Sequence, residues 1–149
     1  MSTAERALVV IPAYNEAATV ASVVQGVIVA GHEVVVVDDG SSDATATEAR
    51  GAGATVLELP VNLGVGGALR CGFRWAVANG YDTVVQVDAD GQHDPAAVAG
   101  LLAAARDQAA HLLVGSRFRS EEGFKPSWYR RIPMAVLARL ATRAAGRPI

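Results

Sequence analysis

Cysteine is almost absent from this chain of 149 residues, in which Cys71 is the only one. A single cysteine excludes an internal disulfide. Because the sequence has no CxxC pair and no Cys/His cluster, it also excludes the usual structural zinc sites. A chain without disulfides is typical of a reducing compartment, so we expect a cytoplasmic protein.

Long apolar runs and a secretory leader are also missing. Arginines, Gln25 and the turn at residues 31–33 interrupt the apolar stretches before any of them reaches the roughly 18 residues that a transmembrane helix needs. The first six residues are polar and include Glu5, whereas a signal peptide begins with a basic and then an apolar segment. From these absences we expect a soluble chain.

The charge is unevenly distributed along the chain. Hydrophobic residues make up 51% of the sequence, which is enough for the core of one domain and excludes an intrinsically disordered protein. Residues 1–116 hold 5 basic and 13 acidic side chains, whereas residues 117–149 hold 8 basic and 2 acidic ones. The basic C-terminal part indicates an anionic partner, such as a phosphate, a lipid headgroup or a nucleic acid, or else a solvated helix face.

Five apolar runs rich in β-branched residues predict five buried strands. They lie at residues 8–11, 34–37, 55–59, 83–87 and 112–114. Continuous apolar runs, as opposed to alternating ones, are typical of parallel strands that are buried on both faces. The segments between them suit crossover helices. The sequence therefore predicts an α/β fold with a mostly parallel central sheet flanked by helices.

The helix signals and the C-terminal region complete the predicted organisation. Asp94 followed by Pro95 predicts the start of a helix. Residues 116–127 read as a loop of a length that often serves as a lid, and residues 128–145 as a helix with an apolar stripe edged by arginines. That helix either lies on a membrane surface or packs on the sheet. We therefore divide the chain into a core at residues 1–119 and a lid loop with a basic helix at residues 120–149.

Polar segments follow the predicted strands, where open α/β sheets bind their ligands. These segments are residues 12–16, 38–43, 88–93 and 115–117. Neither a GxGxxG turn after the first strand nor a Walker lysine is present, so the common dinucleotide and P-loop sites are not indicated. The glycines at residues 64–67 do not form GxGxxG either, and taken alone they indicate close packing of a helix.

Asp88 and Asp90 are the most informative pair. Two carboxylates at i and i+2 after a buried strand can reach one hard cation, and Gln92 offers a third oxygen. Mg²⁺ or Mn²⁺ bridging to a diphosphate would neutralise both sides and stabilise a departing nucleotide. The alternative is a pair of solvent-exposed turn acids. A phosphatase of the haloacid-dehalogenase type also uses two aspartates at this spacing, but its motif normally follows the first strand and continues to Thr or Val where Gln92 stands.

A second set of polar residues follows the two first predicted strands. Asp38 and Asp39 suit hydrogen bonds to a base edge or to ribose hydroxyls, and Tyr14 is placed to cover a base. Helix capping explains Ser42 and Asp43 but not the two aspartates before them.

Five ordered motifs together resemble the family 2 inverting glycosyltransferases. They are Ile11-Pro-Ala-Tyr-Asn-Glu16, Val37-Asp-Asp-Gly-Ser-Ser-Asp43, Asn62-Leu-Gly-Val-Gly-Gly-Ala68, Asp88-Ala-Asp-Gly-Gln-His93 and Gly115-Ser-Arg117. Within that family the chain is most similar to polyprenyl-phosphate sugar synthases of the dolichyl-phosphate mannose synthase type, over residues 7 to about 119. The resemblance implies a GT-A (Rossmann-like) fold, a GDP- or UDP-linked sugar donor, and Mg²⁺ or Mn²⁺.

The resemblance also implies roles for individual residues. The nucleotide-sugar-binding positions are matched by Pro12, Ala13, Tyr14, Glu16, Asp38, Asp39, Asp88 and Ala89, and the metal positions by Asp88, Asp90 and Gln92. Arg117 matches an arginine near the transferring phosphate and is, with Asp90, the implied catalytic residue. Arg117, Arg130 and Arg131 are implied to face the acceptor phosphate. Family members continue past the position of Ile149, so the chain resembles a catalytic domain that is truncated at its C-terminus.

The implied activity is metal-dependent transfer of a sugar to polyprenyl phosphate with inversion. A phosphate acceptor is already ionised at neutral pH and attacks without a general base. The expected location is the cytoplasmic side of an anionic membrane surface, at its periphery, with no nucleic-acid partner. Two alternatives stay open: a transferase that uses a hydroxyl of a saccharide or small metabolite, with its base outside this chain, and a fragment that binds donor without turnover.

Overall fold

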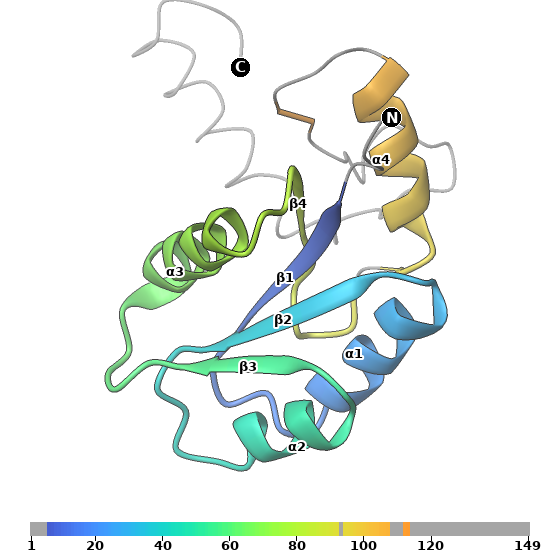
Figure 1. Cartoon of the computed structure of the whole chain (residues 1–149). Helices are drawn as coiled ribbons and strands as arrows, with labels where there is room; N and C mark the ends of the chain where they lie inside the picture. The colour runs from blue at the N-terminus through green and yellow to red at the C-terminus, as the bar shows by residue number, and fades with distance from the viewer. Residues whose placement is uncertain (1–5, 93, 108–111, 114–149) are drawn as a thin grey trace, which may run out of the picture. The chain divides into compact units, whose positions relative to one another are not determined.

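The fold is seen in a computed structural model that describes residues 6–92, 94–107 and 112–113. Within these residues strands and helices alternate strictly along the chain (Figure 1). The elements are β1 (Ala7–Ala13), α1 (Val20–Val29), β2 (Glu33–Asp38), α2 (Thr45–Gly51), β3 (Thr55–Glu58), α3 (Gly64–Ala78), β4 (Thr83–Gln86) and α4 (Ala97–Asp107). This alternation confirms the predicted α/β class.

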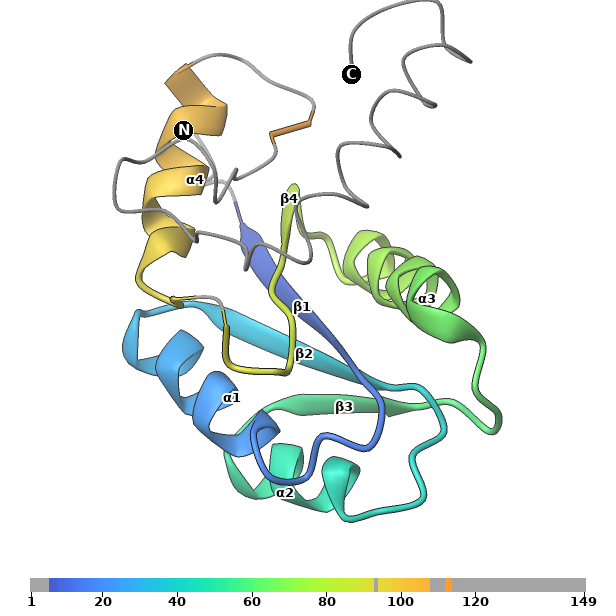
Figure 2. The same ribbon diagram turned by 180° about the vertical axis from the view of Figure 1, so that it is seen from behind.

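The four described strands form one parallel sheet in the order β3-β2-β1-β4 (Figures 1 and 2). Val9 of β1 lies opposite Val34 of β2 on one side and Val85 of β4 on the other. The chain runs outward from β1 to β3 and then returns past β1 to form β4. The strand order therefore reverses between β1 and β4, which is the point where open α/β sheets bind ligands.

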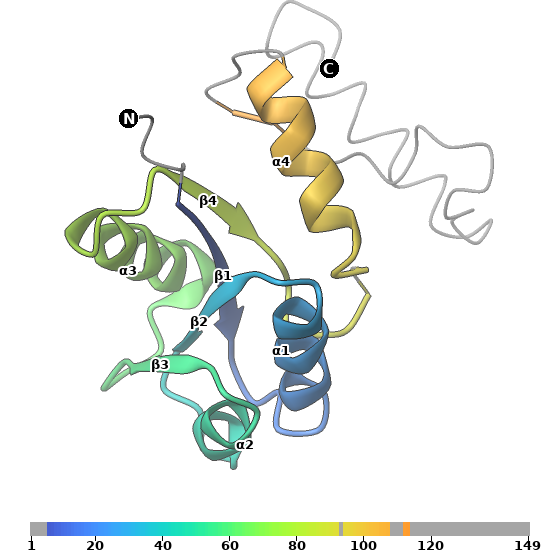
Figure 3. The same cartoon turned by 45° about the vertical axis from the view of Figure 1, so that its right-hand side comes forward.

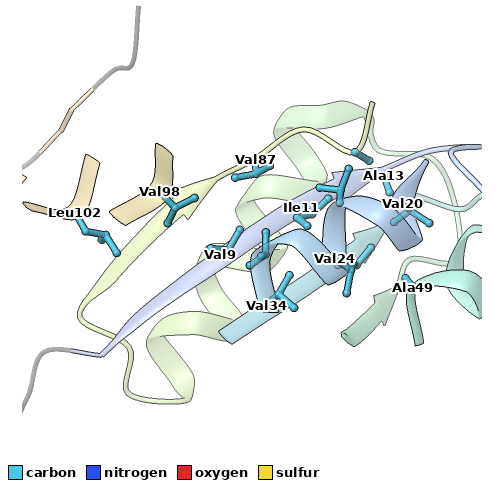
Figure 4. Packing of buried hydrophobic residues seen from close by; sticks show 14 residues of the cluster. Val9, Ile11, Ala13, Val20, Val24, Val34, Ala49, Val87, Val98 and Leu102 are labelled. Atoms are coloured by element: carbon cyan, nitrogen blue, oxygen red, sulfur yellow. The ribbon is translucent and has the colours of Figure 1, made fainter. Parts of the chain in front are cut away.

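Helices cover both faces of this sheet, α1, α2 and α4 on one face and α3 on the other (Figure 3). Val9 and Ile11 of β1 pack with Val24 of α1 and Val98 of α4 (Figure 4). The residues between them on β1 face the opposite core, where Val10 packs with Ala68 and Ala76 of α3 and with other residues. Because both faces are covered, every position of the strand is apolar.

The fifth predicted strand is not formed at the two of its residues that the structure describes. Leu112 and Leu113 have no regular secondary structure, and Leu112 is 83% exposed. A run of three apolar residues is too short to specify a strand by its pattern alone. Val114, the predicted loop at 116–127 and the predicted helix at 128–145 lie outside the described residues.

The predicted helix start at Asp94 is confirmed. The backbone N–H of Ala96 donates to Asp94 Oδ1 at 2.9 Å, and α4 begins at Ala97. None of the helices in the described part of the chain has the length and apolar character that a membrane span requires.

Candidate functional site

A cavity of about 230 Å³ opens where the strand order reverses. Its walls come from the carboxyl ends of β1, β2 and β4 and from the first turns of α3. They are formed by Pro12, Ala13, Tyr14, Glu16, Asp39, Val65, Ala68, Asp88, Ala89 and Asp90. Eight of these ten residues are predicted from the sequence to bind donor or metal. Ligand sites for small molecules typically measure about 300–1,000 Å³, so the described residues enclose part of such a ligand.

All charged side chains of the described cavity lining are acidic. Its described residues include four carboxylates, from Glu16, Asp39, Asp88 and Asp90, and no lysine or arginine. These acidic side chains attract a cation that enters the cavity, so the lining favours a cation or a ligand that arrives with one.

Two neighbouring aspartates at the end of β2 have different surroundings. Asp39 lines the cavity, is 3% exposed, and accepts a hydrogen bond from the Leu63 N–H at 2.7 Å. Its own N–H donates to the Ala13 carbonyl at 2.8 Å. Asp38 does not line the cavity, because its Oδ1 accepts hydrogen bonds from the backbone N–H and the hydroxyl of Ser41. The geometry thus places Asp39 at the site and Asp38 at the last position of β2, bonded to Ser41 of the following turn, and the nucleotide-binding role of Asp38 stays a prediction.

The loop that carries Tyr14 is held by hydrogen bonds to the loop after β2. Asn15 has a φ of 55°, in the left-handed region that asparagine tolerates better than most residues, and its N–H donates to Ser41 Oγ at 2.9 Å. The Glu16 N–H donates at 2.8 Å to the hydroxyl of Thr45, which is fully buried. Tyr14 itself is 48% exposed. Its ring therefore lies at the cavity on a fixed backbone and is accessible to a ligand.

The carboxylate of Asp43 adds a charged group to the hydrogen bonds that join these two loops. Its carboxylate accepts hydrogen bonds from the Thr45 hydroxyl, from the Thr45 N–H at 2.9 Å and from the Ala17 N–H at 3.2 Å. These bonds favour the ionised form, and the bond from the Thr45 hydroxyl contributes most to lowering the pKa of Asp43. The two loops are therefore joined most firmly while this carboxylate is ionised.

Asp88 and Asp90 lie on the cavity wall after β4, as the sequence predicts. Asp88 Oδ1 accepts a hydrogen bond from Gln86 Nε2 at 3.1 Å, and Asp90 Oδ1 accepts one from the Gln92 N–H at 2.9 Å. Gln92 is exposed and is not part of the lining, so its backbone shapes the turn while its role as a metal ligand stays a prediction.

The donor set fits a hard divalent cation that binds through few protein ligands. Within the described ranges, no group of three or more His, Cys, Asp or Glu side chains gathers where it could hold a metal. Mg²⁺ is usually held by one or two carboxylates, with waters and substrate phosphates as its other ligands. Asp88 and Asp90 on one wall provide that kind of partial shell, and carboxylate oxygens suit Mn²⁺ as well.

Val65 and Ala68 are cavity residues that were not predicted as such from the sequence. Both belong to the glycine-containing segment that begins α3, and Gly64 starts this helix with a φ of 77°. The glycine-containing segment was the sequence signal that could have pointed to these two cavity residues, but its glycines alone indicate close packing of a helix. Arg117, Arg130 and Arg131 lie outside the described residues, so their roles stay predictions.

Curated proteins similar to this chain include two bacterial lipid-phosphate sugar transferases. An undecaprenyl-phosphate mannosyltransferase of Micrococcus luteus is 40% identical over 119 residues, which are 75% of this chain and 48% of that protein. A polyprenol monophosphomannose synthase of Mycolicibacterium smegmatis is 38% identical over 122 residues, which are 76% of this chain and 46% of that protein. The chain thus spans about half the length of these relatives.

Among solved structures, one of glucosyl-3-phosphoglycerate synthase from Mycobacterium tuberculosis has the same fold over most of this chain. That protein was crystallised with Mn²⁺, UDP-glucose and phosphoglyceric acid. The similarity has a TM-score of 0.57 at 33% identity and covers 67% of this chain and 39% of the other. It confirms the GT-A fold that the sequence motifs imply.

A family profile covers nearly the whole chain. Residues 8–147 match "Glycosyl transferase family 2", a range that includes the five motifs and all ten residues of the cavity lining. This chain therefore belongs to glycosyl transferase family 2.

Proposed function

We propose that this chain is the donor-binding part of a glycosyltransferase that moves a sugar from a nucleotide diphosphate to polyprenyl phosphate, with inversion and with a divalent cation. The observation that carries the proposal is the position and charge of the cavity. It lies where the strand order reverses, and its described lining holds four carboxylates and no basic side chain.

The charge of the lining supports a cation as part of the donor complex. A nucleoside diphosphate is itself an anion, and two like charges 4 Å apart repel by about 4 kcal/mol at the effective dielectric constant of a protein surface. A diphosphate therefore binds in this cavity only together with a compensating positive charge. Asp88 and Asp90 would hold Mg²⁺ or Mn²⁺, which when bound stabilises negative charge on the departing diphosphate.

Asp39 and Tyr14 would hold the nucleoside. One carboxylate oxygen of Asp39 accepts the Leu63 N–H, and the other has no hydrogen-bond partner among the described residues. That second oxygen is suited to accept from a ribose hydroxyl or from a base N–H. The half-exposed ring of Tyr14 can stack on the base. These contacts would fix the nucleoside end of the donor.

Polyprenyl phosphate is the acceptor that the curated relatives support. The names of both proteins describe sugar transfer to a polyprenyl phosphate or polyprenol. A phosphate acceptor needs a cation to position it but no general base, and Arg117, Arg130 and Arg131 are our candidates for that positioning. The enzyme would accordingly work at the cytoplasmic surface of a membrane.

A second candidate is transfer to a hydroxyl of a small phosphorylated acid. It is favoured by the similarity to the synthase that was crystallised with UDP-glucose and phosphoglyceric acid. The two candidates share the donor site and differ in the acceptor. Incubating the chain with labelled nucleotide sugars and either polyprenyl phosphate or phosphoglycerate distinguishes them by which acceptor becomes labelled.

Calorimetry of GDP and UDP binding, with and without Mn²⁺, tests the donor site. We expect one of the two nucleotides to bind in Mn²⁺ and to bind much more weakly after chelation. Asp90→Ala should lower the Mn²⁺-dependent affinity by roughly tenfold or more, because even outer-shell partners of a metal contribute that much. Asp107→Asn removes one exposed negative charge at the end of α4 and should leave the affinity unchanged. Parent-like binding by Asp90→Ala in Mn²⁺ would refute the metal assignment.

A further inference from the structure

The outward face of α3 combines arginines with exposed apolar side chains. Arg70, Phe73, Arg74 and Val77 follow the spacing i, i+3, i+4 and i+7, so they share one side of the helix. All four are exposed, with Phe73 at 42% and Val77 at 76%. The sheet-facing side is formed by Ala68, Gly72 and Ala76, which are buried. The exposed stripe therefore points away from the sheet.

The composition of this side differs from that of an ordinary solvated helix face. Such a face mixes acidic and basic side chains, whereas α3 contains two arginines and no acidic residue. One exposed apolar side chain continues this stripe just before the helix, at Leu63 (54%), which lies at i relative to Arg70 at i+7 and Arg74 at i+11. Val65 is also exposed (62%), but its spacing to Ala68 and Gly72 puts it on the sheet-facing side, where it lines the donor cavity. The apolar and cationic stripe thus runs along the outer side of α3 and begins at Leu63, whose N–H bonds to the cavity residue Asp39.

We propose that this surface, defined by Leu63, Arg70, Phe73, Arg74 and Val77 and here called the α3 surface, docks on an anionic lipid bilayer. Apolar side chains such as Phe and Val enter the boundary between headgroups and acyl chains, while arginines pair with lipid phosphates. The proposal rests on the proposed function, because a polyprenyl phosphate acceptor resides in a bilayer. Docking through α3 would hold the donor site near the bilayer, because Leu63 at one end of this surface is bonded to the cavity residue Asp39.

Charge argues for a bilayer and against a second copy of this chain. A two-fold contact places the same patch of both copies face to face. Arg70 and Arg74 would then approach the same arginines of the other copy, and α3 offers no acidic residue to pair with them. A membrane that contains anionic lipids supplies the complementary charge and the apolar phase together.

Site-specific fluorescence tests where the chain meets the membrane. Cys71 is the only cysteine, so Val77→Cys in a Cys71→Ser background accepts one environment-sensitive label on the α3 surface. Val29→Cys in the same background is the matched control, since Val29 is 87% exposed and belongs to α1 on the other face of the sheet. With phosphatidylcholine vesicles that contain phosphatidylglycerol, we expect a blue shift and quenching by brominated lipid at position 77 and little change at position 29. Equal responses at both positions, or none at position 77, would overturn the proposal.

Two double variants that remove the same charge distinguish the effect of the α3 surface on vesicle binding from the effect of the net charge of the chain. Arg70→Gln with Arg74→Gln should lower partitioning onto the anionic vesicles by about fivefold per arginine, or roughly 25-fold together. Arg50→Gln with Arg106→Gln removes the same charge from α2 and α4 and should lower it much less. Equal losses in the two double variants would also overturn the proposal. If nucleotide binding in Mn²⁺ is retained in that case, the docking surface is rejected and the donor site stands, whereas absent nucleotide binding in the parent rejects the proposed function itself.

Discussion

Gly72→Ala perturbs the contact that holds α3, and with it one wall of the cavity, against the sheet. A Cβ atom at this position would lie 2.6 Å from Val10 Cγ1 and 3.2 Å from Val37 Cγ2. Both valines are 0% exposed and have few rotamers, so the helix must move outward. Overpacking of this kind costs about 1–3 kcal/mol, while replacing glycine by alanine in a helix returns about 1 kcal/mol. We expect a net loss of up to about 2 kcal/mol in the free energy of unfolding, measured by urea denaturation.

Gly100→Ala is the matched control for this prediction. Gly100 lies within α4, and an added Cβ would meet no atom within 4 Å. The control should therefore gain about 0.5–1 kcal/mol from helix propensity alone, and the difference between the two variants isolates the overpacking. Because Val65 and Ala68 move with α3, Gly72→Ala should also weaken nucleotide binding. If Gly72→Ala stabilises the chain as much as Gly100→Ala does, α3 does not approach the sheet as closely as described.

Three further predictions concern the loops around the cavity. Asp39→Ala should lower the free energy of unfolding by about 1–3 kcal/mol, because the Leu63 N–H loses its hydrogen-bond acceptor. The same change should weaken uridine or guanosine binding in calorimetry, and unchanged affinity for both nucleosides would count against Asp39 as a ligand. The pKa of Asp43 is lowered from its ordinary 3.8, chiefly by the hydrogen bond from the Thr45 hydroxyl. The stabilisation by this carboxylate is therefore complete above that value and is lost as the pH falls through the lowered pKa. The difference in unfolding free energy between the parent and Asp43→Asn should shrink below about pH 4, and a constant difference would contradict the assignment. Asn15→Leu should destabilise the chain by about 1–2 kcal/mol relative to Asn15→Gly, because leucine tolerates a φ of 55° poorly, and equal urea midpoints would refute that strain.

Strands β1 and β2 could be predicted because nearly all of their positions are buried, whereas those of β3 and β4 are half-buried or exposed. Residues of β1 alternate between two cores that are both apolar, so the run is continuous, although the strand extends beyond the predicted residues 8–11 to Ala7–Ala13. The start of α4 could also be predicted from the sequence, because Asp94 caps it through a local hydrogen bond. The run at 112–114 carries the same residue types over fewer positions, and the pattern alone could not show that Leu112 is exposed.

The cavity could be predicted in outline but not in its details. Parallel strands bring their carboxyl ends to one edge, so the polar residues after β1, β2 and β4 were expected to meet there. Which of Asp38 and Asp39 lines the cavity depends on the turn that Ser41 closes, and this is a matter of side-chain geometry. Val65 and Ala68 reach the cavity because α3 crosses back over the sheet to β4, a long-range arrangement that no local pattern contains.

The carboxylates of the cavity are better explained by ligand binding than by stability. Asp39 is buried and contributes to the fold through its bond to the Leu63 N–H, but Asp90 is exposed and accepts a hydrogen bond from the nearby Gln92 N–H. A second and a third carboxylate on the same wall add repulsion without burying apolar surface. Natural proteins keep such locally unfavourable groups where function requires them. A cation held by Asp88 and Asp90 would compensate this charge, so on the proposed function the folded chain should be most stable when cation and nucleotide are bound together.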